Sequence, residues 1–64
     1  MDEFHYHEVV DRTHIAINLF YDAVLTHPAV IDSKELVTLG EEITDKMYEF
    51  YRLASERADE RSSN

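Results

Sequence analysis

Apolar residues recur every three or four positions between Phe4 and Leu25, which is the spacing of one face of an α-helix. The stripe consists of Tyr6, Val10, Thr13, Ile17, Phe20 and Val24, and it is widened by Val9, Ala16 and Ala23. The proline at position 28 disfavours helical geometry in the residue before it and has no N–H group to continue the helical hydrogen bonds. We therefore expect a first helix over residues 3–26 and a turn over residues 27–32.

A second helical pattern starts after this turn. Its N-terminal cap is either Asp32, with Glu35 three residues later, or Ser33. The apolar positions that follow are Leu36, Leu39, Ile43, Met47, Phe50 and Leu53 or Ala54. Gly40 interrupts this pattern at a cost of about 1 kcal/mol relative to alanine, and it is suited to the close approach of a neighbouring helix. We expect a helix over residues 33–59 and a frayed tail over 60–64, where the apolar spacing ends.

Two long helices joined by a short turn predict an all-α fold, with one antiparallel two-helix hairpin over residues 1–64. Such a hairpin cannot cover both of its apolar stripes, and Val37, Tyr48 and Tyr51 add apolar surface on the flank of the second helix. A chain of 64 residues without cysteine also needs more than its own small core for stability. We predict that two copies pair into a homodimeric four-helix bundle.

The balance of charge bears on the partner. Fourteen acidic residues against six basic ones give a net charge of −8. Repulsion by phosphates disfavours direct binding to nucleic acid, so a protein partner is expected. No apolar run reaches the roughly 20 residues that span a bilayer, and the N-terminal sequence MDEFHYHE is acidic where a signal peptide is basic. We expect a cytoplasmic protein without membrane contact.

One stretch of the first helix resembles a metal-binding pattern. His7, Asp11 and His14 share a helical face, with Glu3 one turn earlier, and histidine with carboxylate is a ligand set for zinc. The second helix offers no completing ligand, and a solvated face is the alternative, so we assign no metal and no cofactor. The serines lie at a helix cap or near the C-terminus, and a thin hairpin has no deep pocket, so we assign no catalytic residue.

An acidic cluster on the second helix is the strongest candidate for a binding site. Glu42 and Lys46 form a favourable i, i+4 pair, whereas Asp45 meets acids four residues away on both sides. Aromatic residues beside the acids are typical of a protein-binding surface, although a solvated face is again the alternative. The predicted partner-binding residues are Glu41, Glu42, Asp45, Tyr48, Glu49 and Tyr51.

The stretch DSKELVTLGEEITDKMYEFYR resembles the second helix of the sporulation-regulating aspartyl-phosphate phosphatases, which are helical hairpins of similar length. Their signature SQELD reads GEEIT here, from Gly40 to Thr44. The resemblance implies dephosphorylation of a response regulator. It also implies a catalytic aspartate at the position of Thr44, and Asp45 lies one position later, turned by about 100° around the helix.

Together these features predict a small acidic regulatory or inhibitory protein that binds a protein partner through its helical surface. The partner is either a nucleic-acid-binding protein, whose binding site the acids would mask, or a response regulator. Two alternatives are an aspartyl-phosphate phosphatase of a sporulation response regulator and a self-assembling structural module.

Overall fold

The computed structural model describes the backbone of residues 3–62 and the side chains of residues 5–59. Its elements are α1 (Glu3–Phe20), the π-helix η1 (Tyr21–Leu25), α2 (Pro28–Ile31) and α3 (Lys34–Ser62). No strand occurs in this part of the chain. The predicted all-α class is confirmed.

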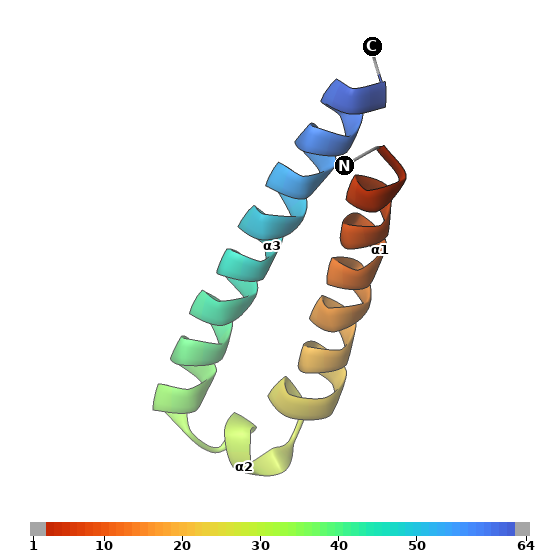
Figure 1. Ribbon diagram of the computed structural model, residues 1–64. Helices are drawn as coiled ribbons and strands as arrows, with labels where there is room; N and C mark the ends of the chain where they lie inside the picture. The colour runs from red at the N-terminus through yellow and green to blue at the C-terminus, as the bar shows by residue number, and fades with distance from the viewer. Residues whose placement is uncertain (1–2, 63–64) are drawn as a thin grey trace.

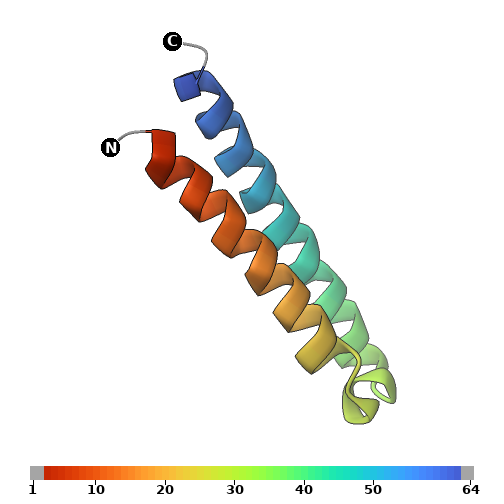
Figure 2. The same cartoon turned by 90° about the vertical axis from the view of Figure 1, so that its right-hand side faces the viewer.

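Helices α1 and α3 lie side by side and run in opposite directions, with α2 at the turn between them (Figure 1). A view turned by 90° shows the same pairing along the length of α1 (Figure 2). The molecule measures 48 × 16 × 13 Å, so it is one layer of two helices. Each helix therefore packs against a single long neighbour and leaves most of its circumference open.

The contact between α1 and α3 is made by two stripes with alternating spacings of three and four residues. On α1 the half-buried or buried side chains are Tyr6, Val10, Thr13, Ile17 and Phe20, as predicted. On α3 the stripe facing α1, called here the inner stripe, comprises Val37, Gly40, Thr44, Met47, Tyr51, Ala54 and Ala58. Ile17, Ala54 and Ala58 are the described hydrophobic side chains that are buried, at 3%, 8% and 2% exposure.

The inner stripe corrects the predicted core face of α3. Met47 and Ala54 were placed correctly, but the larger apolar residues lie one position earlier and are exposed. This outer stripe consists of Leu36, Leu39, Ile43, Phe50 and Leu53. One residue corresponds to about 100° around the helix. Small residues at Gly40, Ala54 and Ala58 allow the two backbones to approach closely, so they occupy the contact and the bulkier side chains are displaced from it.

A π-helical turn changes the face that α1 presents at its end. The backbone N–H of Thr26 donates to the carbonyl of Tyr21 over 3.2 Å, a bond that spans five residues instead of four. After Phe20 the next inward residue is therefore Leu25, which is half-buried, and the predicted Val24 is 42% exposed. Leu25 packs against Gly40, where a Cβ atom would overlap its Cδ2.

The connection begins at the predicted place but contains a helical turn of its own. His27 caps α2, its Nδ1 accepting from the N–H of Ala29 at 3.1 Å, and Pro28 occupies the first helical position. At α3 the Ser33 hydroxyl accepts from the N–H of Leu36 at 3.2 Å, so Ser33 is the cap. Helix α3 continues to Ser62, three residues past the expected end at 59, and residues 63–64 of the expected frayed tail lie outside the described residues.

Candidate protein-binding surfaces

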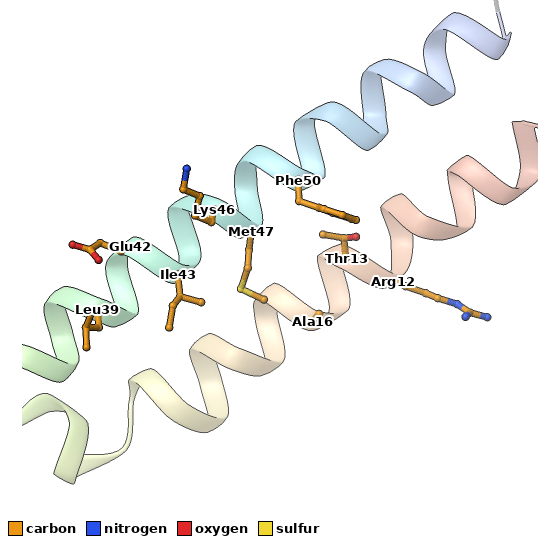
Figure 3. A pocket seen from close by; sticks show the side chains of 9 residues that line it. All are labelled: Arg12, Thr13, Ala16, Leu39, Glu42, Ile43, Lys46, Met47 and Phe50. Atoms are coloured by element: carbon orange, nitrogen blue, oxygen red, sulfur yellow. The ribbon is translucent and has the colours of Figure 1, made fainter.

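An apolar groove follows one side of the helix pair. Its walls are Leu39, Ile43, Met47 and Phe50 from α3 and Thr13 and Ala16 from α1, around a volume of about 820 Å³. In Figure 3 these side chains lie between the two helices, whereas Lys46 and Glu42 point away from α1. Most of the outer stripe thus forms one wall of an open, mostly apolar surface.

The two cations beside the groove, Arg12 and Lys46, form ion pairs within the chain. Arg12, on the α1 side, forms an ion pair with Glu8 one turn earlier. Lys46, on the α3 side, donates to Glu49 Oε2 at 3.3 Å, where the sequence favoured a pair with Glu42. Both pairs are exposed and contribute little stability. Their effect is that each cation at the groove has a carboxylate close by.

The predicted acidic cluster extends around α3 from its far side to the edge of the apolar groove. Glu41, Asp45 and Glu49 are exposed, and we call these three residues with Tyr48 the acidic face. Glu42 is also exposed, but it lies at the edge of the apolar groove. Glu49, seven residues after Glu42, points within about 20° of it and pairs with Lys46, so it stands between the far side of α3 and the groove.

The two predicted tyrosines differ in accessibility. Tyr48 is 56% exposed and lines a shallow depression with Asn18 and Tyr21 on the side away from the apolar groove. Tyr51 belongs to the inner stripe, is half-buried, and has its ring centroid 6.1 Å from that of His14. Tyr48 is therefore the aromatic residue that the acidic face presents, and Tyr51 is mainly part of the helix contact.

The residues that suggested a metal or a phosphatase site lie as follows. His7, Asp11 and His14 are exposed on α1, and no group of three or more histidine, aspartate or glutamate residues in the described part of the chain is placed to hold a metal ion. Thr44 is half-buried, and its hydroxyl donates to the carbonyl of Glu41 at 3.0 Å. The Thr44 hydroxyl is therefore hydrogen-bonded to the backbone of its own helix. Asp45 is exposed next to it.

Comparison of the chain with protein-family models, with curated proteins and with solved structures finds no match. Across the described residues, no helix combines the length and the apolar character that crossing a membrane requires. The geometry therefore carries the functional interpretation, and it points to surfaces, since the apolar groove is open to solvent.

The exposed outer stripe is the feature that sequence reasoning missed. Its members were assigned to the core because they follow one another at helical spacings of three or four residues. A signal was present, since two apolar stripes with the same spacing run along this helix one residue apart. Such a double pattern predicts a helix with two neighbours, and a lone pair of helices supplies one.

Proposed function

We propose that this chain is a small acidic regulatory or inhibitory protein that binds a protein partner through its helical surface. The observation that carries the proposal is the acidic face, where three exposed carboxylates and an exposed tyrosine stand together on one rigid helix. A rigid helix presents such groups with little ordering cost on binding. A protein with a net charge of −8 also attracts basic surfaces from a distance.

The partner that fits this face is a protein with a basic binding surface. Surfaces that bind nucleic acid have this character because they contact phosphates through lysine and arginine. Carboxylates spaced along α3 would compete for the same cations, so binding would mask the nucleic-acid site. A response regulator as partner is supported by the sequence resemblance alone.

The finer architecture belongs to the same proposal. We take the antiparallel helix pair to be a stable hairpin that pairs with a second copy into a four-helix bundle. The support is the small buried core, since of the described hydrophobic residues only Ile17, Ala54 and Ala58 are buried, whereas five large side chains of the outer stripe are exposed. A chain that only self-assembles, without a foreign partner, is the alternative that the following experiment tests.

The test compares three immobilised baits: the wild-type chain, a variant with Glu41→Lys and Asp45→Lys, and a control with Asp11→Lys and Asp22→Lys. All four carboxylates are exposed, and both double variants change the net charge by the same amount, but the control sites lie on α1 and η1. Proteins from the source cells are captured at low and moderate salt and identified by mass spectrometry.

We expect a partner that the wild-type and control baits retain and that the Glu41/Asp45 variant loses. The purified partner should then associate at least about tenfold more slowly with that variant, because interfacial charges mainly steer the encounter. Equal capture by both double variants would show that the acidic face is only a solvated surface. Capture of the chain itself and nothing else would support the self-assembling module.

A further inference from the structure

Each long helix carries two stripes of contact positions, one residue apart. Outer-stripe residues Leu39, Ile43 and Phe50 immediately precede the inner-stripe residues Gly40, Thr44 and Tyr51. On α1 the positions that precede the inward-facing residues are Val9, Arg12, Ala16 and Leu19. Because one residue turns a helix by about 100°, the second stripe points at roughly a right angle to the first. In a four-helix bundle each helix has two neighbours in that arrangement.

The exposed area is larger than that of a compact monomer of the same mass. The accessible surface is 5184 Å² for 7.5 kDa. A compact monomer of that mass exposes roughly 4,250 Å² by the usual size scaling. The excess of roughly 900 Å² is close to the 800 Å² or so that each partner buries in a protein interface of standard size.

The two walls of the apolar groove differ in size. Helix α3 contributes Leu39, Ile43 and Phe50, whereas α1 contributes Thr13 and Ala16. Large side chains pack best against small ones across an interface. A second copy offers both walls, so α3 of each copy can lie against α1 of the other. The cations beside the groove enter this interface with a carboxylate already paired to each, since Arg12 pairs with Glu8 and Lys46 with Glu49.

We infer that the apolar groove is the surface on which a second copy of this chain docks, with α3 of each copy against α1 of the other. A two-fold axis parallel to the helices relates the copies and leaves the height of each residue along that axis unchanged. An α3 residue that is level with an α1 residue of its own chain is therefore also level with the same α1 residue of the second copy. The pairs His14–Tyr51 and Leu25–Gly40 set the register of the two helices and place Phe50 nearly level with Ala16, so Phe50 then lies opposite Ala16 of the second copy. The inference rests on the self-association proposed above and not on the acidic face, which stays outside the bundle.

The first test is the mass in solution of the wild-type chain and two variants, Phe50→Glu and Tyr48→Glu. The two residues are both aromatic, lie two positions apart on α3 and are 58% and 56% exposed, but only Phe50 lines the groove. Two positions separate their directions by about 160°. Sedimentation equilibrium and the concentration dependence of Tm report the dimer.

We expect twice the 7.5 kDa chain mass for the wild type and for Tyr48→Glu. Phe50→Glu should raise the dimer Kd at least about 30-fold, because a carboxylate would be buried in the interface. A folded wild-type monomer with a Tm independent of concentration would overturn the inference, and so would equal dissociation by both variants. Either result leaves the proposal for the acidic face standing.

The second test does not depend on how Phe50→Glu folds. The chain has no cysteine, so single cysteines can be placed freely. Mixing Phe50→Cys with Ala16→Cys under mild oxidation should give a disulfide-linked heterodimer in high yield, because the two residues are nearly level and both line the groove. Tyr48→Cys mixed with Ala16→Cys is the control, since Tyr48 lies on the acidic face only two residues from Phe50. A yield no higher than in the control would overturn the arrangement.

Discussion

Gly40 lies where a neighbouring side chain leaves little room for a larger residue. It is buried in the inner stripe, and a Cβ atom there would overlap the Cδ2 atom of Leu25. Alanine gains about 1 kcal/mol of helix propensity and displaces only the end of one side chain, so Gly40→Ala should change the free energy of unfolding by less than about 1 kcal/mol. Gly40→Val adds two branches in the same space and should destabilise by about 2 kcal/mol.

Urea unfolding at one protein concentration measures both variants. The double variant Leu25→Ala, Gly40→Val is the control, since a smaller residue 25 should recover part of the loss. If Gly40→Val were as stable as Gly40→Ala, Leu25 would not hold the position that we describe.

Individual residues were predictable where a local rule decides them. Ser33 was one of two candidate caps, and its hydroxyl makes the capping hydrogen bond. The acidic cluster was visible in the sequence, but the place of Glu42 at the edge of the groove was not, because it follows only once the face of α3 toward α1 is known. Tyr51 was assigned to the surface for the same reason, and it packs by His14 instead.

At the scale of the element, hydrophobic periodicity predicted both long helices. It located the contact face of α1 up to Phe20 and failed at Val24, because the pattern assumes α-helical turns and the chain makes a π-turn over Tyr21–Leu25. It failed on α3 by one residue, because the size of apolar residues does not reveal which of two adjacent stripes meets the same chain. The short helix α2 within the turn was likewise not predictable from hydrophobic periodicity.

The π-turn leads to a prediction about deletions. Removing Ala23 takes one residue out of the wide turn, so Leu25 would follow Phe20 at α-helical spacing and still face Gly40. We expect the free energy of unfolding to change by less than about 1 kcal/mol, since a regular turn replaces a π-turn. The matched control is deletion of Ala16, another exposed alanine of the first helical segment.

Deleting Ala16 should be far more damaging, because it turns every preceding residue of α1 by about 100° and moves Val10 and Thr13 out of the helix contact. A loss of at least about 3 kcal/mol is expected. Thermal and urea unfolding followed by circular dichroism compare the two variants. Equal loss in both would mean that the wide turn is needed for the fold and does not merely adjust the direction of Leu25.

At the scale of the whole molecule, the helix pair has two faces with different chemistry. The apolar groove is bordered by ion pairs made within the chain, and the acidic face on the far side of α3 carries carboxylates and Tyr48. If the groove joins two copies, the dimer displays two acidic faces, and its overall charge is double the −8 of one chain. Self-association and partner binding then respond in opposite ways to ionic strength.

Salt should strengthen the dimer and weaken the complex with a basic partner. Dimerisation buries apolar groups while bringing together two chains of the same charge, so screening removes repulsion and lowers the dimer Kd. Partner binding gains from attraction between opposite charges, so the same screening slows association. We expect the dimer Kd to fall several-fold, and the rate constant for association with the partner to fall about tenfold, between about 0.05 and 0.5 M salt.

Sedimentation equilibrium measures the dimer Kd, and surface-based kinetics measure association with the partner. The control is the double variant Glu41→Lys, Asp45→Lys, whose association should lose most of its salt dependence. A dimer that weakened with salt would be held by ion pairs between the copies and not by the outer stripe.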